Sequence, residues 1–223
     1  MINRSTEDYI KGIFSLQQDG GSVTTSLLAK HLKIGDGSVT DMVKKLSDKK
    51  LIEYEPYKGV KLTGEGRRLA LKMIRRHRLW EMFLVRYLNY TWDEIHDEAE
   101  LLEHVTSDEL EHRIDHALGY PKVDPHGAPI PDAAGEVHEI ECRTLSGCRV
   151  NDTGIIVRVK DESPEMLKLM TRLGLVLNTK IAVKEIIGVD GTVVIGIVGS
   201  KTEIPLSPVF ARSIFIQSEG EAA

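Results

Sequence analysis

Imidazole and carboxylate side chains gather in one stretch of the chain, residues 96–116. At helical spacing His96, Glu100, Glu103 and His104 stand at i, i+4, i+7 and i+8, so they share one face of the predicted helix. Buried charges are costly unless they are paired or bound to a metal. The pattern therefore predicts a divalent-metal site that controls the rest of the molecule.

A smaller group of the same kind lies upstream, where His77 and Glu81 are one turn apart on a predicted helix over 64–88. That helix also carries a broad apolar surface. The acidic helix, predicted over 93–118, has apolar residues beside its candidate ligands. They are expected to pack inward and are Leu101, Leu102, Val105 and Leu110.

Charge is strongly segregated along the 223 residues. Residues 1–90 hold 17 Lys and Arg against 10 Asp and Glu, whereas residues 91–141 hold 2 against 15. Residues 142–223 are nearly balanced, with 10 against 9, which leaves the chain at −5. The basic block fits a nucleic-acid face and the acidic block fits a cation site. Ordinary solvated surfaces explain so large a contrast poorly.

The remaining composition is that of an ordinary globular protein, 41% hydrophobic and 28% charged. No apolar run approaches the length of a spanning helix, and the N-terminus has no secretion signal. Cys142 and Cys148 lack zinc-finger spacing. We expect a reduced, cytoplasmic compartment.

The first 64 residues predict a winged helix-turn-helix. A helix over 5–18, with Ser5 or Thr6 as its N-cap, precedes a short helix over 24–32. A tight turn leads to a second short helix, expected to start at Ser38. Residues 51–62 then read as strand, turn and strand, which is a wing, and Thr63 should cap the next helix.

In this interpretation the second short helix enters the major groove of DNA. Ser38, Thr40 and Asp41 are expected to face base edges, and the cations nearby are expected to contact phosphates. Those cations are Lys44, Lys45 and Lys58. The alternative is a helical hairpin that packs against something else, which leaves the basic block and the wing unexplained.

Two further parts complete the predicted organisation. Helices within residues 65–140 suit dimerisation, and a Pro-rich connector over 119–135 contains Asp124 and His126 in the phrase DPHG. Residues 150–223 contain short β-rich runs, with Asp190–Gly191 as a hairpin turn and a helix over 163–174, which predicts a small barrel. The fold class is thus α+β, with domains at 1–64, 65–140 and 150–223.

Several of these segments together resemble one family. HDEAELLEHVTSDELEHR, preceded by RRHRLWE and followed by YPKVDPHG and PIP, is similar to the metal-dependent repressors of the diphtheria-toxin-repressor family. The resemblance covers essentially the whole chain. It implies a homodimeric bacterial transcription repressor with an SH3-like C-terminal barrel, which binds palindromic operator DNA when Fe²⁺ or Mn²⁺ is loaded.

The resemblance also implies two metal sites. One would use Asp8 with Glu100, Glu103 and His104. The other would draw on a larger set, completed from the barrel. Its members would be His77, Glu81, His96, Asp124, His126 and Asp161, with Glu162 and Glu165 as rivals of Asp161.

Departures from the family pattern bear on the metal. Iron-sensing members have methionine where Asp8 stands and cysteine where Glu100 stands, and some relatives have cysteine at Asp124. Carboxylates in place of sulfur favour a hard ion such as Mn²⁺, with Fe²⁺ as the alternative. Small manganese regulators have glutamate where Lys11 stands, which weighs against a closely spaced binuclear site here.

Two other functions compete with this one. A di-metal carboxylate enzyme typically needs Glu-x-x-His on two helices, and the chain offers it once, at Glu109 and His112. A DNA-binding protein whose acidic helix contacts a partner protein would bind DNA regardless of chelators. We expect a repressor and no enzymatic activity, with activation that weakens as the pH falls toward about 6 because ligating imidazoles must be neutral.

Overall fold

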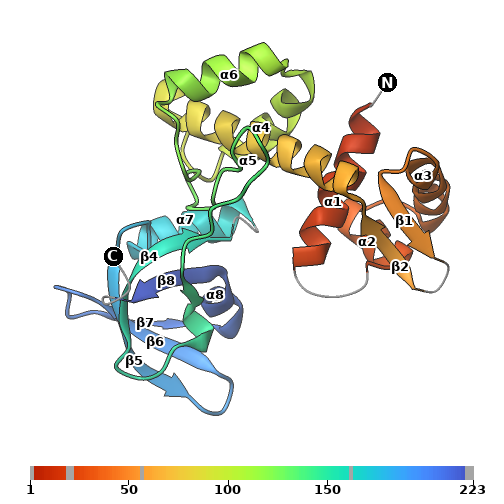
Figure 1. The fold of residues 1–223 in the computed structure, drawn as a ribbon. Coiled ribbons are helices and arrows are strands. Elements are labelled where there is room, and N and C mark those ends of the chain that lie inside the picture. The colour runs from red at the N-terminus through yellow and green to blue at the C-terminus, as the bar shows by residue number, and fades with distance from the viewer. Residues whose placement is uncertain (1–2, 19–22, 56–57, 161–162, 219–223) are drawn as a thin grey trace. The chain divides into compact units, whose positions relative to one another are not determined.

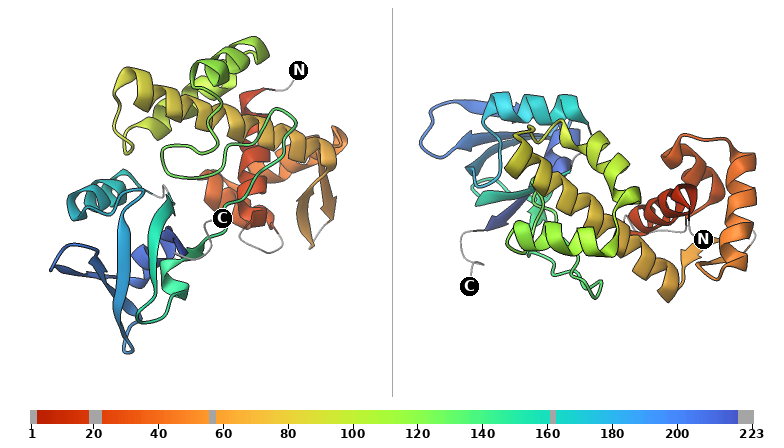
Figure 2. Two further views of the ribbon diagram at one scale, coloured as in Figure 1. Left: turned by 60° about the vertical axis from the view of Figure 1, so that its left-hand side comes forward. Right: turned by 90° about the horizontal axis from the view of Figure 1, so that it is seen from above.

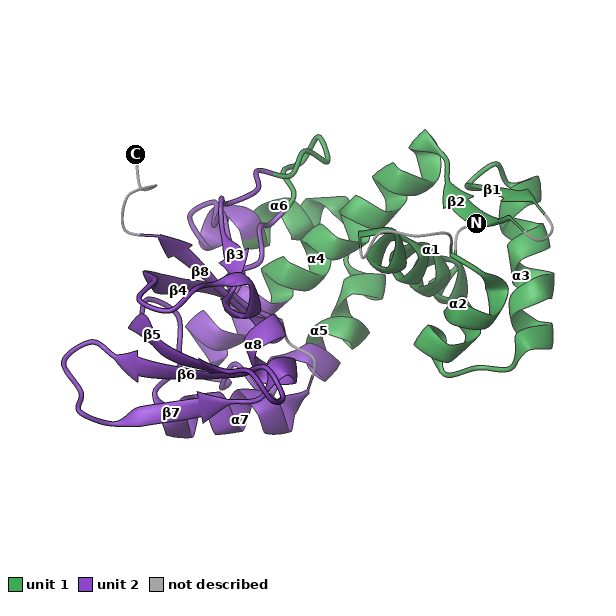
Figure 3. Ribbon diagram, turned by 90° about the horizontal axis from the view of Figure 1, so that it is seen from below, with its two compact units in different colours: residues 1–80, 99–114, 131–137 green, residues 81–98, 115–130, 138–223 purple. Residues whose placement is uncertain are grey.

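The computed structural model describes residues 3–18, 23–55, 58–160 and 163–218. These residues form two compact units, which Figure 3 shows in different colours. Unit 1 comprises residues 1–80, 99–114 and 131–137, and unit 2 comprises residues 81–98, 115–130 and 138–223. The division into three domains at 1–64, 65–140 and 150–223 stays a prediction.

Unit 1 begins with the expected helix-turn-helix and wing (Figures 1 and 2). Its first elements are α1 (Arg4–Gln18), α2 (Thr25–Leu32), α3 (Asp36–Asp48), β1 (Ile52–Glu55) and β2 (Gly59–Leu62). The two strands pair antiparallel as a wing. Their apolar faces meet in one core with α1, whose Ile10 and Ile13 are fully buried.

Two helix starts differ from the prediction. The N-cap of α1 is Asn3, whose Oδ1 accepts hydrogen bonds from the N–H and the hydroxyl of Thr6, so Ser5 and Thr6 already lie inside the helix. Helix α3 begins at Asp36 after Gly35, and Ser38 is its third residue. Asn and Asp compete well with Ser for the ends of helices, so a Ser or Thr nearby does not fix the boundary.

The long helix α4 (Gly64–Leu88) has the predicted bounds. Thr63 caps it as expected, since its Oγ1 accepts from the N–H of Gly66. Gly66 has no room for a side chain, because a Cβ there would lie 2.0 Å from the Leu51 carbonyl oxygen. This close approach fixes the start of α4 against the wing.

The acidic stretch is not the single helix that was predicted. It forms α5 (Ile95–Leu102), a 3₁₀ turn η1 (Glu103–Val105) and α6 (Asp108–Ala117). Thr106 takes an extended conformation, and the Ser107 hydroxyl accepts from the N–H of Leu110, which starts α6. A capping Ser before two acids was visible in the sequence as TSDE.

The expectation that the apolar residues of this stretch pack inward is also wrong for three of the four. Leu101 is 53% exposed, Val105 78% and Leu110 40%. The inner flank was predicted for one continuous helix, and that periodicity does not continue past the break after η1, which separates Leu110 from Leu101 and Val105.

Unit 2 contains one six-stranded antiparallel sheet in the order β3-β8-β4-β5-β6-β7. Its elements after the connector are β3 (Arg143–Thr144), η2 (Leu145–Gly147), β4 (Thr153–Val159), α7 (Pro164–Leu173), β5 (Lys180–Ile187), β6 (Thr192–Ile197), β7 (Glu203–Leu206), α8 (Pro208–Ser213) and β8 (Ile214–Ser218). The predicted runs became β4, β5, β6, β8 and α7. Short β3, β7 and α8 were missed because each offers too few residues for a period to show.

The core of unit 2 lies between this sheet and its helices. Met166, Leu167 and Met170 of α7 pack with the inward residues of the strands. Trp92, from the turn before α5, packs against the same core. No helix among the described residues has the length and apolar character to cross a membrane.

Candidate metal centres

The first candidate site, site 1, lies in unit 1 where α1 approaches the end of α5 and η1. Asp8, Glu100 and His104 each offer a ligand atom within 4.8 Å of the others. Asp8 Oδ1 and His104 Nε2 are 3.0 Å apart. Both atoms are buried, and neither has a hydrogen-bond partner among the described residues.

Glu7 determines which nitrogen of His104 faces Asp8. The Glu7 carboxylate lies 2.7 Å from His104 Nδ1, and a carboxylate accepts hydrogen bonds, so Nδ1 carries the proton. In the neutral imidazole, which is the form that binds a metal, Nε2 then presents its lone pair to Asp8 Oδ1. At this distance the two acceptor atoms need a proton or a metal cation between them, so the residues present fit a divalent ion. Glu7 was not predicted from the sequence as part of the site. An acidic residue in the first turn of a helix is already explained by its favourable interaction with the helix dipole.

The ionisation of Asp8 reflects the same environment. Burial raises the pKa of its carboxyl above the ordinary value, the charge of His104 opposes the rise, and the charge of Glu100 adds to it. A carboxylate held at a raised pKa gains from a nearby cation. Site 1 is therefore electrostatically poised for a metal ion.

Glu103 is fully buried and shared between two other groups. Its Oε1 accepts from Lys11 Nζ at 2.7 Å, and its Oε2 lies 2.6 Å from His77 Nδ1. Lys11 also donates to Glu100 at 2.5 Å. Burial alone would lower the pKa of Lys11, but Glu103 and Glu100 outweigh it and raise the pKa. The Lys11 ammonium therefore lies between two of the predicted ligands, Glu100 and Glu103, and pairs with both.

A tryptophan–threonine pair holds the turn that carries His104. Trp80 Nε1 donates to Thr106 Oγ1 at 2.7 Å, and this hydroxyl donates to the Leu102 carbonyl at 2.7 Å. The second bond closes the end of α5 at the point where the helix tightens into η1. Neither Trp80 nor Thr106 was singled out from the sequence.

The second candidate site, site 2, lies in unit 2. Glu81 of α4 and Asp124 and His126 of the connector offer ligand atoms within 4.8 Å of one another, and their exposures are only 1%, 4% and 2%. His126 Nδ1 is buried without a hydrogen-bond partner and lies 4.0 Å from Glu81 Oε1. Two buried carboxylates and a buried imidazole, one nitrogen of which has no hydrogen-bond partner in the described part of the chain, fit a divalent ion.

The connector is held tightly where it supplies these ligands. One oxygen of Asp124 accepts from the N–H groups of His126 and Ala128. Gly127 has φ +84°, and a Cβ there would lie 2.0 Å from the Val157 carbonyl oxygen, so only glycine fits. The N–H of Val159 in β4 donates to the His126 carbonyl. Site 2 thus rests on the sheet of unit 2.

The other predicted ligands are placed as follows. His96 Nδ1 is 3.9 Å from Glu81 Oε1, with a half-exposed side chain. His77 contacts Glu103, and its Nδ1 is 3.6 Å from Glu100 Oε2. Asp161 and its rival Glu162 lie outside the described residues, and Glu165 is in the first turn of α7.

The predicted DNA-contacting residues lie largely at the surface of unit 1. Ser38, Asp41, Lys44, Lys45 and Lys58 are exposed, while the opposite side of α3 is buried through Val39, Val43 and Leu46. The Thr40 hydroxyl donates to the Asp36 carbonyl within the helix, and Lys58 pairs with Glu55 across the wing turn. Their contact with DNA stays a prediction.

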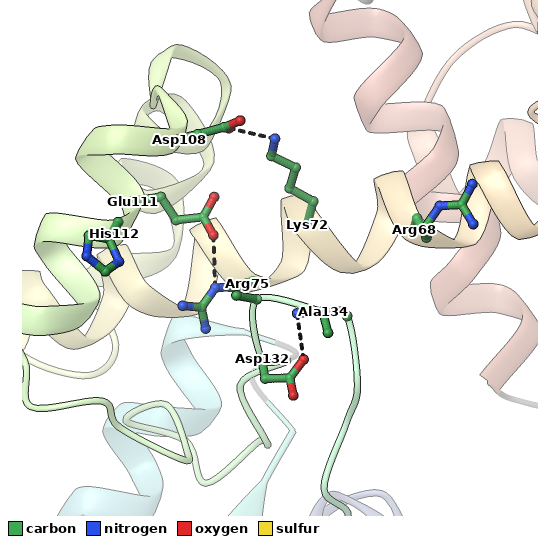
Figure 4. A pocket seen from close by; sticks show the side chains of 10 residues that line it. Arg68, Lys72, Arg75, Asp108, Glu111, His112, Asp132 and Ala134 are labelled. Atoms are coloured by element: carbon green, nitrogen blue, oxygen red, sulfur yellow. Dashed lines mark hydrogen bonds and ion pairs between the residues drawn. The ribbon is translucent and has the colours of Figure 1, made fainter.

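Unit 1 also contains a cleft of about 400 Å³ that no prediction used (Figure 4). Its charges pair with one another: Lys72 with Asp108 at 2.6 Å and Arg75 with Glu111 at 2.9 Å. Arg75 also donates to the Pro131 carbonyl. These pairs fasten α6 and the 131–137 segment to α4, so we assign the cleft a structural role.

Three family descriptions match successive parts of the chain. Residues 1–60 match the N-terminal DNA-binding domain of iron-dependent repressors, and residues 63–132 match their metal-binding and dimerisation domain. Residues 143–218 match the FeoA domain. Together they follow the order of the predicted organisation and support the SH3-like character of the C-terminal sheet.

Individual proteins agree. The diphtheria toxin repressor of Corynebacterium glutamicum is 30% identical over 211 residues, which are 90% of this chain and 91% of that protein. The iron-dependent repressor IdeR of Mycobacterium leprae is 32% identical over 127 residues, 57% of this chain but only 55% of that protein. The chain thus spans about half the length of the mycobacterial relatives that it matches.

A solved structure described as a manganese-dependent transcriptional repressor in complex with manganese is 39% identical, with a TM-score of 0.89, covering 95% of this chain and 99% of the other. The structure of the manganese regulator SloR is 34% identical, with a TM-score of 0.80, covering 98% and 100%.

Proposed function

Because the chain belongs to the diphtheria-toxin-repressor family of metal-dependent transcription regulators, we propose that it represses transcription by binding operator DNA as a metal-loaded homodimer. The observation that carries the proposal is the pair of buried, unsatisfied atoms Asp8 Oδ1 and His104 Nε2, 3.0 Å apart. The two residues come from different segments of unit 1, α1 and η1.

The mechanism follows from that placement. A bound divalent ion supplies positive charge between groups that otherwise repel. Asp8 and His104 then tie α1, the first helix of the DNA-binding region, to the segment around η1, while Glu7 keeps His104 in its ligating tautomer. Fixing α1 lowers the ordering cost of DNA binding, which is a coupling of about 1–3 kcal/mol in typical cases, or roughly 5–150-fold.

We infer that site 1 takes a single ion and prefers Mn²⁺, with Fe²⁺ as the alternative. Lys11 already neutralises Glu100 and Glu103, which supports one ion instead of two. Asp8 and Glu100 are hard oxygen donors, and no sulfur donor stands in their place. Solved relatives are described with manganese, Zn²⁺ and Cd²⁺, so the metals that a family member can bind are broader than the one that it senses.

Site 2 is proposed as a second metal site, with Glu81, Asp124 and His126 as its ligands. His96 and Asp161 remain candidates to complete it. The ion there would link α4, the connector and the sheet of unit 2. A carboxylate at Asp124 again favours a hard ion.

The proposed partner in the dimer is a second copy of the chain, seated on the exposed apolar residues around η1. Leu101, Val105 and Leu110 lie within the stretch that matches the dimerisation domain of iron-dependent repressors. The ligands Glu103 and His104 lie between Leu101 and Val105 in the sequence, so an ion at site 1 would order the segment that also presents this surface.

The proposal assigns no enzymatic activity and places the protein in the cytoplasm, where bacterial DNA lies. The closely similar chains are described as repressors and regulators. A DNA-binding protein that only contacts a partner through its acidic helix is the second candidate, and it predicts binding that is indifferent to chelators.

The test is a DNA-binding titration of chelated protein with Mn²⁺, Fe²⁺, Co²⁺ and Zn²⁺, using duplexes selected from a random-sequence pool. Wild type is compared with Asp8→Met and Glu100→Cys. We expect Mn²⁺ to activate wild type best and the two variants to shift toward softer ions. Metal-independent binding would refute the repressor mechanism, whereas a strong Fe²⁺ preference of wild type would refute only the metal assignment.

A further inference from the structure

We propose that Trp92 and Thr171 are positioning residues for His126, so that the barrel helix α7 determines whether site 2 is ready for a metal. All three residues belong to unit 2. The inference rests on the proposed function in one respect, that site 2 holds a divalent ion. Its structural part, the control of the His126 tautomer, stands apart from that.

The Trp92 backbone fixes which nitrogen of His126 is protonated. Its carbonyl oxygen lies 2.8 Å from His126 Nε2. A carbonyl only accepts, so in the neutral imidazole Nε2 carries the hydrogen and Nδ1 keeps its lone pair. Nδ1 is the buried atom without a hydrogen-bond partner, and it is the one nearer to Glu81. The contact therefore selects the tautomer that can bind a metal.

The Trp92 side chain also contacts the same ring. The indole stacks on the His126 imidazole, with ring centroids 5.8 Å apart and an interplanar angle of 28°. The indole and the carbonyl that contact the imidazole both belong to Trp92. A movement of Trp92 would therefore change both the ring plane and the tautomer of His126.

Thr171 of α7 connects this arrangement to the barrel. Trp92 Nε1 donates to Thr171 Oγ1 at 2.8 Å, and that hydroxyl donates to the Leu167 carbonyl at 3.0 Å. Because the Thr171 hydroxyl donates its hydrogen to the Leu167 carbonyl, its oxygen is left to accept the hydrogen bond from the indole. The helix α7 thus orients the hydroxyl. Leu167 itself is buried in the core of unit 2. The sequence separation of 79 residues between Trp92 and Thr171 means that the barrel must be folded before His126 is held.

The test uses Thr171→Val, which keeps the shape of the side chain and removes only the hydroxyl. Thr171 is exposed, so the change removes little core packing. Thr179→Val is the matched control, because the Thr179 hydroxyl donates to the Gly174 carbonyl in the same unit without reaching Trp92. Thr171→Ser should restore the wild-type behaviour. Trp92→Phe should have at least the effect of Thr171→Val, since it removes the same hydrogen bond and also replaces the indole that stacks on His126.

Two readouts are made on the full-length chain. The first is the ¹⁵N chemical shifts of the His126 ring in metal-free protein, with the His126 signal identified by its loss in His126→Gln. We expect the Nε2–H tautomer in wild type, Thr179→Val and Thr171→Ser, and a mixture of tautomers in Thr171→Val and Trp92→Phe. The second is Mn²⁺ binding in a His104→Ala background, which removes site 1.

In that background we expect Thr171→Val to weaken Mn²⁺ binding about tenfold, the lower end for residues that orient a ligand. The double variant Trp92→Phe/Thr171→Val should be no weaker than Trp92→Phe alone, because the hydrogen bond between the two residues is already lost in that variant. Equal tautomer ratios and equal affinities in Thr171→Val and Thr179→Val would overturn the inference. If His126→Gln left Mn²⁺ binding unchanged while the tautomer shift occurred, the metal at site 2 would be refuted and the positioning role upheld.

Discussion

Each of the two candidate metal sites holds one imidazole so that one of its two nitrogens can bind an ion. The groups that surround the imidazole differ between the sites. In site 1 a carboxylate, Glu7, holds the proton on His104 Nδ1, and in site 2 a backbone carbonyl, that of Trp92, holds it on His126 Nε2. Site 1 contains a built-in cation, Lys11, whereas site 2 is formed by nearly inaccessible residues on a rigid glycine turn. Site 1 thus suits a responsive switch, and site 2 suits a structural ion.

Each site also depends on a tryptophan that donates to a threonine, which in turn donates to the carbonyl four residues earlier. Trp80, Thr106 and Leu102 form this chain in unit 1, and Trp92, Thr171 and Leu167 form it in unit 2. In unit 1 the threonine closes the helix end beside the ligands. In unit 2 it lies on a distant helix. Both sites therefore need the tertiary fold of their unit, because Glu7 and His104 are 97 residues apart in the sequence and Trp92 and Thr171 are 79 residues apart.

The largest expected effect distinguishes the switch from the structural site. His104→Ala should abolish the metal-dependent gain in DNA affinity, which is on the order of 5–150-fold, because the bridge from η1 to Asp8 is lost. His126→Ala should leave most of that gain in place. His112→Ala, an exposed histidine on α6, is the control. DNA-binding titrations with Mn²⁺ and with chelator measure all three, and equal losses from His104→Ala and His126→Ala would contradict the division of roles.

Lys11 provides the next test. Lys11→Met should destabilise the metal-free protein by about 3 kcal/mol, because Glu103 is left buried without its cation. Excess Mn²⁺ should recover much of the loss, since binding to the folded state stabilises it. Urea denaturation with and without Mn²⁺ measures both effects.

Lys30→Met, at an exposed position of α2, is the matched control for that experiment and should change the stability by less than about 0.5 kcal/mol. If Lys11→Met were as stable as Lys30→Met without metal, the ammonium would not be holding the carboxylates in the way that the distances indicate.

A smaller effect compares exposed valines of the two units. Val105→Asp should weaken dimerisation at least about tenfold, because a charge would be buried against the second copy. Val189→Asp, at a position 91% exposed in unit 2, should have no effect on it. Sedimentation equilibrium measures the dimer constant. A dimer that tolerates aspartate at Val105 would place the interface elsewhere.

The smallest expected effect is a pH dependence confined to site 1. Burial raises the pKa of Asp8, so the metal-free folded state keeps a proton there up to a higher pH than an ordinary aspartate does. Metal binding must release that proton, so affinity at site 1 falls as the pH drops through the raised pKa. Mn²⁺ titrations at several pH values should show that the affinity depends less steeply on pH in Asp8→Asn than in wild type. An unchanged dependence would show that the proton that competes with the metal is not on Asp8.

Much of the fold was readable from local patterns. The winged helix, the bounds of α4 and the hairpin at Asp190 follow from periods, caps and turn residues that act over a few positions. The errors arose where short-range signals compete. Asn3 displaced Ser5 and Thr6 as the cap, and the helix that was predicted as continuous breaks at Thr106, with Leu101, Val105 and Leu110 at the surface.

The site was only partly readable. His104 and Glu103 belong to a long motif, but Glu7, Trp92 and Thr171 have no local feature that marks them. Their roles come from contacts over 79 to 97 residues of sequence, which only the tertiary structure brings together. Lys11 was visible as a departure from a family pattern, and Glu100 and Glu103 were predicted as metal ligands, yet the pairing of Lys11 with both was not predicted.

The central claim is that Asp8 and His104 hold the ion that switches DNA binding. It is tested most directly by selecting duplexes from a random-sequence pool with wild type and His104→Ala, each with Mn²⁺ and with chelator. We expect wild type with Mn²⁺ to enrich a two-fold symmetric sequence, and neither chelated wild type nor His104→Ala to do so. Enrichment of the same sequence by chelated wild type, or by His104→Ala with Mn²⁺, would contradict it.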